Sequence, residues 1–308
     1  MSSQESFNIL VFGKTGAGKS TLINSLTNDN PHLPEGHEYE SCTEHVQSAS
    51  TVYKGREIVF YDTPGFDDSK IAPELYLLKL IESLGVIYEK YEKKPHIHGV
   101  LWIQPIHERR MTGTDVLNLD TFQDIIGSDG FRNLVFVTNF WRQPLPQYQL
   151  DHEQSLIHNQ KYFAKAISAG ARAGPAYRIF EGMDRASVQQ ALLGAFLNNP
   201  PIVAQSQKEF VDDEKPASET TAGRTQSRIS NEKIKERDAQ IAALKDSLKD
   251  QAKLAQAVKD LQEANDRARQ DMETMKTTYA DSLERMSSQT PNLLVPLIGG
   301  LLAGFLRR

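Results

Sequence analysis

Eight residues near the amino terminus constrain the fold more than any other feature of this chain. Residues 13–20 read Gly-Lys-Thr-Gly-Ala-Gly-Lys-Ser, a complete G-x-x-x-x-G-K-[ST] phosphate-binding pattern. The apolar run Phe7–Phe12 precedes the pattern, and an apolar-periodic stretch, Thr21–Leu26, follows it. A strand, a glycine loop and a helix in this order are the setting in which the pattern binds phosphate. We therefore expect a nucleoside triphosphate site, because a chance glycine-rich turn would not explain the flanking strand and helix.

The chemistry of such a loop assigns a role to each of its residues. Successive backbone N–H groups form a concave nest for anions, and the following helix adds its positive end. Lys19 would reach the β- and γ-phosphates, and Ser20 would hold Mg²⁺. The predicted nucleotide contacts in this segment are Gly13, Lys14, Thr15, Gly16, Ala17, Gly18, Lys19, Ser20 and Thr21.

Two further segments carry residues suited to the same site. Asp62-Thr63-Pro64-Gly65 follows an expected strand, so Asp62 can join the Mg²⁺ shell and the Gly65 N–H can contact the γ-phosphate. Between this segment and the glycine loop, Thr43 could close over Mg²⁺ and the γ-phosphate. Thr43 is a weaker prediction, because a threonine in a polar loop gains significance only from its position.

Composition narrows the range of protein classes. The net charge of −5 does not favour a general nucleic-acid binder. The single cysteine, Cys42, leaves no internal disulfide framework and fits a reducing, cytoplasmic compartment. The first six residues lack the basic and apolar segments of a secretory signal.

Residues 1–204 alternate strand and helix patterns. This alternation predicts an α/β fold with a mainly parallel sheet covered on both faces and one antiparallel strand in a hairpin over Lys54-Gly55. The expected strands are Phe7–Phe12, Val46–Tyr53, Glu57–Tyr61, Gly99–Ile103, Asn133–Thr138 and Ala176–Phe180, and the expected helices are 19–27, 73–92, 114–126, 151–169 and 187–197.

The carboxyl-terminal third has a different composition. Residues 205–228 are polar and rich in helix breakers, which predicts a flexible linker. Residues 229–288 contain neither Pro nor Gly and show apolar residues at alternating spacings of three and four, which predicts a coiled-coil helix with Asn265 at a core position. The alternative is a single amphipathic helix that folds back onto the first domain.

The last segment, 289–308, is an apolar tail that ends in two arginines. The apolar stretch Leu293–Leu306 would span about 21 Å as a helix, less than the ~30 Å core of a bilayer. We expect residues 293–308 to make a membrane contact or a marginal anchor. The alternative is a tail docked on the domain or within an oligomer.

The order of the phosphate loop, Thr43 and Asp62-Thr63-Pro64-Gly65 resembles the Ras-like GTPases. The finer match of Gly13–Ser20 and the segment Ser41–Gln47 resembles the septin–Toc–GIMAP branch, the immunity-associated GTPases, and Ile106–Phe122 resembles fungal members of that group. The resemblance covers about residues 6–200. It implies a three-layer G domain with a mostly parallel six-stranded sheet, GTP or GDP with Mg²⁺ as ligands, and self-association through the nucleotide face.

The base-reading segment departs from the family pattern. Ras-like GTPases read guanine with [NT]-K-x-D, whereas this chain continues Thr138-Asn139-Phe140-Trp141-Arg142 and lacks the carboxylate. We expect Thr138, Asn139 and Trp141 to contact the nucleotide, with Trp141 or Phe140 stacked on the base. Because a site without its polar reader discriminates less between bases, ATP remains an alternative to GTP. The loop near Phe180-Glu181-Gly182-Met183 also lacks the family's S-A-K signature.

A second departure concerns hydrolysis. Phe66 follows Gly65 where Ras-like proteins place a glutamine, and a phenyl ring cannot orient a water by hydrogen bonding. The resemblance implies that Arg110 acts in trans across a dimer, although a solvated surface arginine is the plainer interpretation. The catalytic candidates are therefore Lys19, Thr43 and Arg110, and the metal ligands Ser20, Thr43 and Asp62.

Two functional hypotheses follow from these features. The first is a guanine-nucleotide switch protein that hydrolyses GTP slowly and couples this to dimerisation or assembly through the G face and the coiled coil. The second is a nucleotide-dependent scaffold, binding GTP or ATP with little hydrolysis and acting through the coiled coil and the membrane tail. Phe66 and the missing base-reading carboxylate favour the scaffold, whereas the presence of Lys19, Ser20, Thr43 and Asp62 favours the switch.

Overall fold

The computed structural model describes residues 6–27, 33, 46–66, 72–108, 110–247 and 252–289. The chain divides into two compact units, Met1–Ala222 and Gly223–Arg308, which we describe separately. Thr43 and the predicted tail contact 293–308 lie outside the described residues.

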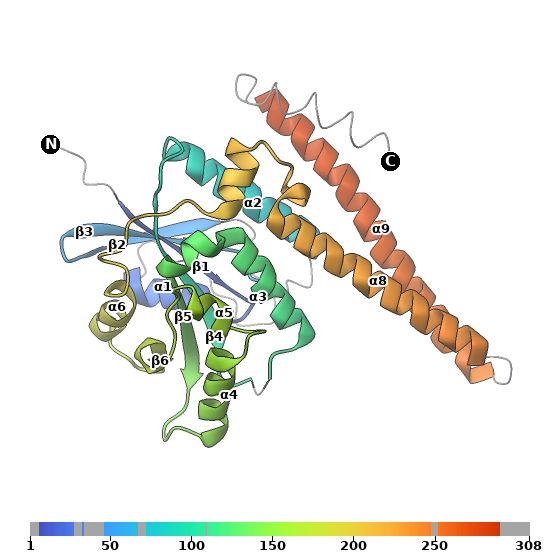
Figure 1. The fold of residues 1–308 in the computed structure, drawn as a ribbon, viewed down its shortest axis with the longest axis horizontal. Helices are drawn as coiled ribbons and strands as arrows, with labels where there is room; N and C mark the ends of the chain where they lie inside the picture. Colours follow the sequence, from blue (N-terminus) through green and yellow to red (C-terminus); the bar gives the residue numbers. More distant parts are fainter. Residues whose placement is uncertain are drawn as a thin grey trace. The chain divides into compact units, whose positions relative to one another are not determined.

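The first unit is built on one six-stranded sheet with the order β2-β3-β1-β4-β5-β6 (Figure 1). All neighbouring strands pair in parallel except β2 and β3, which are antiparallel. The strands are β1 (Phe7–Gly13), β2 (Gln47–Tyr53), β3 (Arg56–Asp62), β4 (Ile97–Pro105), β5 (Leu134–Trp141) and β6 (Arg178–Phe180). The predicted sheet of mostly parallel strands is confirmed.

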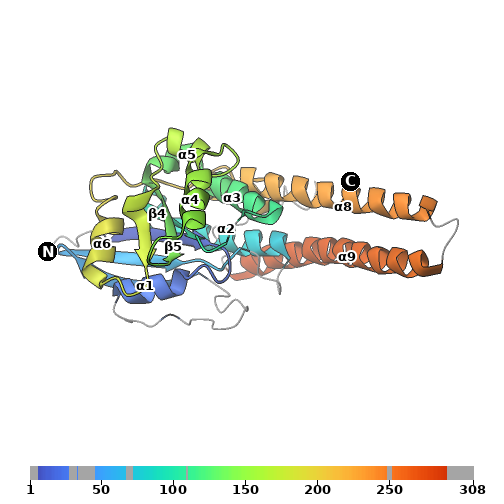
Figure 2. The same cartoon turned by 90° about the horizontal axis from the view of Figure 1, so that it is seen from below.

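Helices cover both faces of this sheet. In Figure 2, α1 and α6 lie on one face, whereas α2, α3, α4 and α5 lie on the other. The bounds are α1 (Lys19–Thr27), α2 (Pro73–Lys90), α3 (Gly113–Ile126), α4 (Gln147–His158), α5 (Ala164–Ser168) and α6 (Arg185–Leu193), with 3-10 turns at Ser128–Asn133 and Pro175–Tyr177. The three-layer arrangement explains why β1 is buried along its whole length.

Local sequence accounts for the hairpin and for one broken helix. Lys54 and Gly55 have φ angles of 50° and 77°, the left-handed pair that a tight two-residue hairpin needs. The predicted helix 151–169 is interrupted between α4 and α5. The side chain of Asn159 accepts from the backbone N–H of Lys161 there, and Phe163 inserts to stack on Phe136. A local turn with a buried ring at its end therefore replaces continuous helix.

Residues 205–220 form packed turns and a helix begins at Thr221, which differs from the flexible linker predicted over 205–228. This segment contains α7 (Gln205–Gln207), the π-helical turn η3 (Lys208–Asp212) and the 3-10 turn η4 (Ala217–Glu219). The buried amide of Gln207 donates to the carbonyl of Leu84, and Tyr88 donates to Asp212 over 3.0 Å. The polar residues that resemble a linker in sequence are thus used in contacts with α2.

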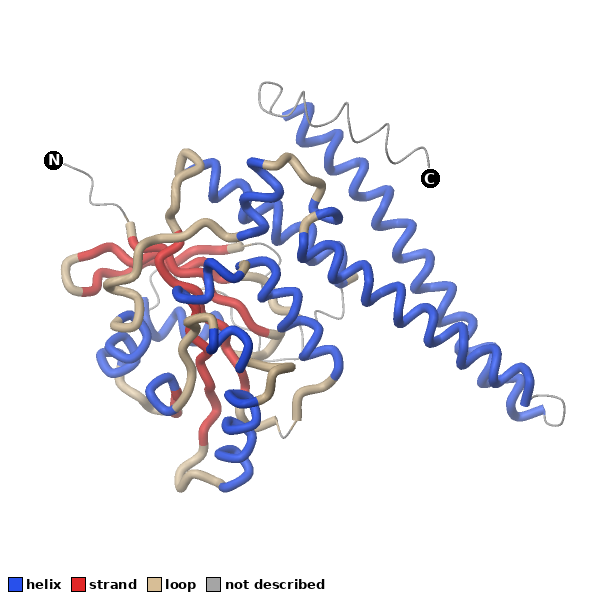
Figure 3. The backbone as a smooth tube through the Cα atoms, in the orientation of Figure 1, coloured by secondary structure: helices blue, strands red, loops and turns tan. Residues whose placement is uncertain are grey.

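The described residues of the second unit form two helices, where one continuous helix was predicted over 229–288. These are α8 (Thr221–Ser247) and α9 (Ala252–Gln289), drawn as long blue tubes in Figure 3. Asn265 is buried, as expected of a core position, and donates to Asp238 of α8 over 2.6 Å. Arg269 pairs with the same carboxylate at 3.1 Å. The contacts of Asn265 and Arg269 with Asp238 therefore join two helices of the same chain.

Among the described residues, no helix is both long enough and apolar enough to cross a bilayer.

Candidate nucleotide-binding site

The phosphate loop connects the buried strand β1 to the first turn of α1. Gly16 and Gly18 have φ angles of 75° and 84°, which L side chains rarely adopt. A Cβ at Gly13 would lie 2.6 Å from the carbonyl oxygen of Ile103, so that position also requires glycine. The loop therefore has the backbone geometry of an anion nest beside a helix N-terminus.

Lys19 is buried at the start of α1, with 6% of its surface exposed. Its Nζ donates to the carbonyl oxygens of Gly13 and Lys14, at 3.2 and 3.1 Å. Burial lowers the pKa of Lys19 to about 8, and the charge of Asp62 partly opposes this effect. A buried ammonium beside two carbonyl oxygens and one carboxylate is well suited to gain phosphate oxygens as ligands.

Ser20 and Asp62 come together from two different elements. Asp62 ends β3, beside Val11 of β1, and is fully buried. The hydroxyl of Ser20 donates to Oδ2 of Asp62 over 2.6 Å. A hydroxyl and a carboxylate in contact beside a phosphate loop are oxygen donors of the kind that Mg²⁺ prefers. The two predicted metal ligands that the structure describes are thus adjacent.

The segment Thr63–Phe66 closes directly onto the phosphate loop. The backbone N–H of Thr15 donates to the carbonyl oxygen of Phe66 over 2.8 Å, and the N–H of Phe66 donates to Gly13 over 3.2 Å. A Cβ at Gly65 would lie 2.6 Å from the nitrogen of Thr15, so only glycine allows this approach. Thr15 Oγ1 is buried there with no hydrogen-bond partner, which fits a loop that gains an anionic ligand.

The Phe66 side chain points away from the site. It is buried and packs against Tyr76 and Trp102, with ring centroids 4.9 and 5.6 Å away. The prediction that Phe66 does not orient a water agrees with this position, because the ring belongs to the core.

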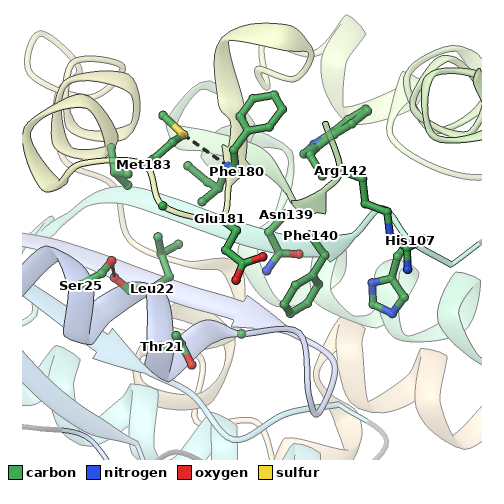
Figure 4. A pocket seen from close by; sticks show the side chains of 15 residues that line it. Thr21, Leu22, Ser25, His107, Asn139, Phe140, Arg142, Phe180, Glu181 and Met183 are labelled. Atoms are coloured by element: carbon green, nitrogen blue, oxygen red, sulfur yellow. Dashed lines mark hydrogen bonds between the residues drawn. The ribbon is translucent and has the colours of Figure 1, made fainter. Parts of the chain in front are cut away.

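A cavity of about 650 Å³ opens beside the start of α1. In Figure 4, Glu181, Asn139 and Phe140 point toward one another above Thr21. Asn139 is buried and donates from Nδ2 to the carbonyl oxygen of Ala17 over 2.6 Å, which ties β5 to the phosphate loop. The lining comprises Gly18, Thr21, Leu22, Ser25, His107, Asn139, Phe140, Trp141, Arg142, Ile179, Phe180, Glu181, Gly182, Met183 and Val188.

Trp141 and Phe140, the two aromatic residues expected to stack on the base, differ in their surroundings. Trp141 is buried, its Nε1 donates to Thr138 over 3.0 Å, and the guanidinium of Arg178 lies 4.4 Å from its ring centre. Arg178 in turn pairs with buried Glu153. Phe140 is exposed and lies at the cavity. Thr138 and Trp141 therefore support the cavity wall, and Phe140 is the ring open to a ligand.

Arg110 is exposed and lies between β4 and α3. The same loop carries Glu108, which forms an ion pair with Lys14 of the phosphate loop. Asp115 lies 3.9 Å from Lys14 and accepts from the N–H of Thr112, which caps α3. Lys14, one of the predicted nucleotide contacts, thus connects the phosphate loop to the segment that carries Glu108 and Arg110.

Two residues at this site were not predicted. Glu181 places a carboxylate in the cavity, whereas the family pattern has its carboxylate shortly after Asn139. The sequence signal for Glu181 is its position in the loop after the last strand, Phe180-Glu181-Gly182-Met183. Gln149 of α4 donates to the carbonyl oxygen of Phe140 near the end of β5, and no sequence signal marks it.

Comparison with known proteins agrees with this geometry. Residues 8–108 match the family described as 50S ribosome-binding GTPase. GTP-binding protein A of Dictyostelium discoideum is 31% identical over 144 residues, covering 46% of this chain and 30% of that protein. GTPase IMAP family member 8 of Rattus norvegicus is 26% identical over 159 residues, covering 52% and 21%. The chain thus spans less than a third of the length of these two relatives.

Solved structures support the fold. Toc33 from Arabidopsis thaliana, in a dimerisation-deficient arginine-to-alanine variant, superposes with a TM-score of 0.51 at 14% identity, covering 65% of this chain and 88% of that one. Toc33 in complex with GDP and Mg²⁺ gives a TM-score of 0.50, also at 14% identity and with the same coverage. Residues 8–108 are thus similar in sequence to a GTPase family, and the fold of the first unit is similar to that of Toc33.

Proposed function

We propose that this protein is a guanine-nucleotide switch that binds GTP or GDP with Mg²⁺ and hydrolyses GTP slowly, with hydrolysis coupled to dimerisation. The observation that carries the proposal is the meeting of three parts at one end of the sheet. These are the phosphate loop, the Ser20–Asp62 pair and the cavity beside Phe140. These parts are suited to the phosphates, to the metal ion and to the base of a nucleotide bound with Mg²⁺.

At the phosphate end, the residues act by charge and by hydrogen bonding. The loop N–H groups and Lys19 would bind the β- and γ-phosphates, and Ser20 and Asp62 would hold the metal. Mg²⁺, when bound, supplies positive charge that neutralises phosphate oxygens. Burying Lys19 costs about 3 kcal/mol at neutral pH, from the drop of its pKa to about 8. Phosphate contacts would offset this cost.

At the base end, Glu181 supplies the carboxylate that the segment after Asn139 lacks. A carboxylate can accept from the N1 and N2 hydrogens of guanine, whereas adenine presents no N–H at its ring N1. Phe140 offers a ring for stacking beside it. GTP is therefore the favoured triphosphate, and similar proteins whose names or structures record GTP or GDP support this choice.

Dimerisation is proposed because the chain's own residues do not complete a hydrolysis site among the described residues. Phe66 lies in the core, and Arg110 is exposed on the neighbouring loop. Arg110 of one copy could contact the phosphates bound to the other. The Toc33 neighbour, whose arginine variant is dimerisation-deficient, supports an arginine at such a face.

The rival function is a nucleotide-dependent scaffold that barely hydrolyses GTP and acts through its helices and tail. The buried Phe66 supports it. Turnover that stays at the uncatalysed level at every protein concentration, with tight GTP binding retained, would favour the scaffold.

The site itself is tested by Lys19→Ala. We expect this variant to lose binding of a fluorescent GTP by at least a hundredfold, because it removes a charge-assisted contact to two phosphates. Lys165→Ala, an exposed lysine on α5, is the matched control and should bind normally. Equal binding by Lys19→Ala and the unaltered protein would refute the assignment.

The tail proposal rests on sequence alone, because residues 290–308 are not described. Leu293–Leu306 and the terminal arginines would give interfacial membrane contact in a cytoplasmic protein. Flotation with anionic liposomes should recover more of the full chain than of a chain ending at Ser288. Equal recovery would mean that the tail packs against protein instead.

A further inference from the structure

Phe140 holds a backbone conformation that a bulky residue rarely adopts. Its φ angle is 61°, in the left-handed region. The pairing of β5 with β6 is irregular between Thr138 and Trp141, which includes this position. Such a conformation costs on the order of 1 kcal/mol or more and persists only where the surroundings hold it. Something must therefore fix Phe140 in place.

The side chain of Gln149 supplies that restraint. Gln149 lies on α4 and is fully buried, at 0% exposure. Its Nε2 donates to the carbonyl oxygen of Phe140 over 3.1 Å, and its Oε1 accepts from the N–H of Arg142 over 3.1 Å. One amide thus bonds both ends of the left-handed turn. The two bonds also fix which end of the amide is the donor.

The consequence is an aromatic ring aimed at the cavity. Phe140 has 45% of its surface exposed, and a Cβ at Gly18 would lie 3.5 Å from its Cζ. His107 meets its edge, with ring centres 5.1 Å apart and planes at 75° (Figure 4). Trp141, the adjacent residue, is already covered by Arg178. Of Phe140 and Trp141, it is therefore Phe140 whose ring is open for a planar ligand to stack on.

We infer that Gln149 is a positioning residue for the nucleotide base, acting through Phe140. The inference rests on the proposed nucleotide site and adds that part of the base affinity depends on an amide that never touches the ligand. Without the amide, the turn would relax toward ordinary backbone angles, and the ring would leave the cavity. Stacking on an aromatic side chain depends little on which base is bound, so we expect the same contribution for any purine nucleotide.

The experiment separates base binding from phosphate binding. Calorimetry would measure the affinities for GTP and for inorganic tripolyphosphate, both with Mg²⁺, and their ratio reports the nucleoside contribution. We expect Phe140→Ala and Gln149→Leu each to lower the ratio by on the order of tenfold, with tripolyphosphate affinity unchanged. Gln149→Met should act similarly, because its side chain has nearly the same length but cannot donate a hydrogen bond to Phe140. This second variant keeps the test valid if Gln149→Leu does not fold.

Gln207 provides a matched control. It is also a buried glutamine at 0% exposure, its Nε2 donates to a backbone carbonyl, and its Oε1 accepts from a backbone N–H. Gln207→Leu removes the same kind of contacts at the α2 side of the domain and should leave the ratio unchanged. A second check uses Phe140→Gly, since glycine tolerates the left-handed angle. Adding Gln149→Leu to that variant should change the ratio less than twofold.

Two results would overturn the inference. Gln149 would be merely structural if its variants lowered both affinities by the same factor, or if they left both unchanged while Phe140→Ala lowered the ratio. Failure of the proposed function gives a different result, because the unaltered protein would then bind GTP no better than tripolyphosphate, or would bind neither.

Discussion

The hydroxyl of Ser20 donates to Oδ2 of Asp62 over 2.6 Å, which joins the first turn of α1 to the end of β3. The sheet order explains the contact, because β3 lies beside β1 and pairs Val11 with Asp62. Residues distant in the sequence thus form one pair of oxygen donors at the phosphate loop. Neither residue alone would make a metal site.

The first prediction follows from this pair. Ser20→Ala and Asp62→Asn should each weaken Mg²⁺-dependent GTP binding by about 2 kcal/mol, or roughly thirtyfold, the size of a contact to a charged group. Titration of fluorescent GTP with Mg²⁺ and with EDTA would measure this dependence. Ser168→Ala, which removes an exposed hydroxyl on α5, is the control. An unchanged Mg²⁺ response in both site variants would place the metal elsewhere.

A second prediction concerns pH. The pKa of Lys19 is lowered to about 8 in the free protein, and bound phosphates would raise it again. Binding therefore requires a proton above pH 8, so GTP affinity should fall about tenfold between pH 7 and pH 9. Calorimetry in buffers of different ionisation enthalpy would also show proton uptake at pH 9.

The control for this pH effect is Lys19→Arg, whose guanidinium stays charged throughout the range. Whatever its absolute affinity, this variant should show a much smaller fall between pH 7 and pH 9. A fall of the same size in both proteins would assign the titration to another group or to the nucleotide.

Sequence reasoning predicted the parts of the fold and site that depend on local pattern. The phosphate loop combines glycine spacing, an apolar strand and a helix start, all within twenty residues. The hairpin at Lys54-Gly55 and the order of strands and helices are similarly local. These features could be predicted because their physical cause lies in adjacent residues.

The features that were missed depend on contacts between distant residues. Glu181 reaches the cavity because β6 lies beside β5, which no local pattern shows. Gln149 looks like any helical glutamine until α4 brings it against Phe140. The segment 205–222 is polar in composition, but its side chains bond to α2. Tertiary contacts decided the structure in each case.

A third prediction tests base selectivity. Glu181→Gln should lower the preference for GTP over ATP by about tenfold, because the side chain that accepts from two N–H groups of guanine loses its charge. Competition of both nucleotides against fluorescent GDP would measure the preference. Glu57→Gln, an exposed carboxylate on β3, should have no effect. An unchanged preference in Glu181→Gln would show that another group reads the base.

A fourth prediction concerns Arg110. If Arg110 acts across a dimer, the GTP turnover per molecule should rise with protein concentration, and Arg110→Ala should remove most of that rise. Arg56→Ala, an exposed arginine at the start of β3, is the control for lost surface charge. A specific activity that is flat from low to high micromolar concentration would end the trans-arginine hypothesis.

The last prediction concerns the helices α8 and α9. Buried Asn265 donates to Asp238, and Arg269 pairs with the same carboxylate, so the polar contact holds two segments of one chain in register. Asp238→Ala would leave Asn265 buried without its acceptor, which should destabilise the hairpin by about 1–3 kcal/mol. Asp271→Ala, an exposed carboxylate on α9, should have little effect. Thermal melting of the full chain, followed by circular dichroism at 222 nm, would compare them.

The same melts distinguish an intrachain hairpin from pairing between copies. A hairpin is unimolecular, so the melting of its helices should not depend on protein concentration. Pairing between chains would raise the melting temperature as concentration increases, and sedimentation would show the larger species. Because Asp238 and Asn265 lie 27 positions apart on facing helices, we expect the concentration-independent result for the full chain. A clear rise with concentration would instead support the coiled-coil association predicted from the sequence.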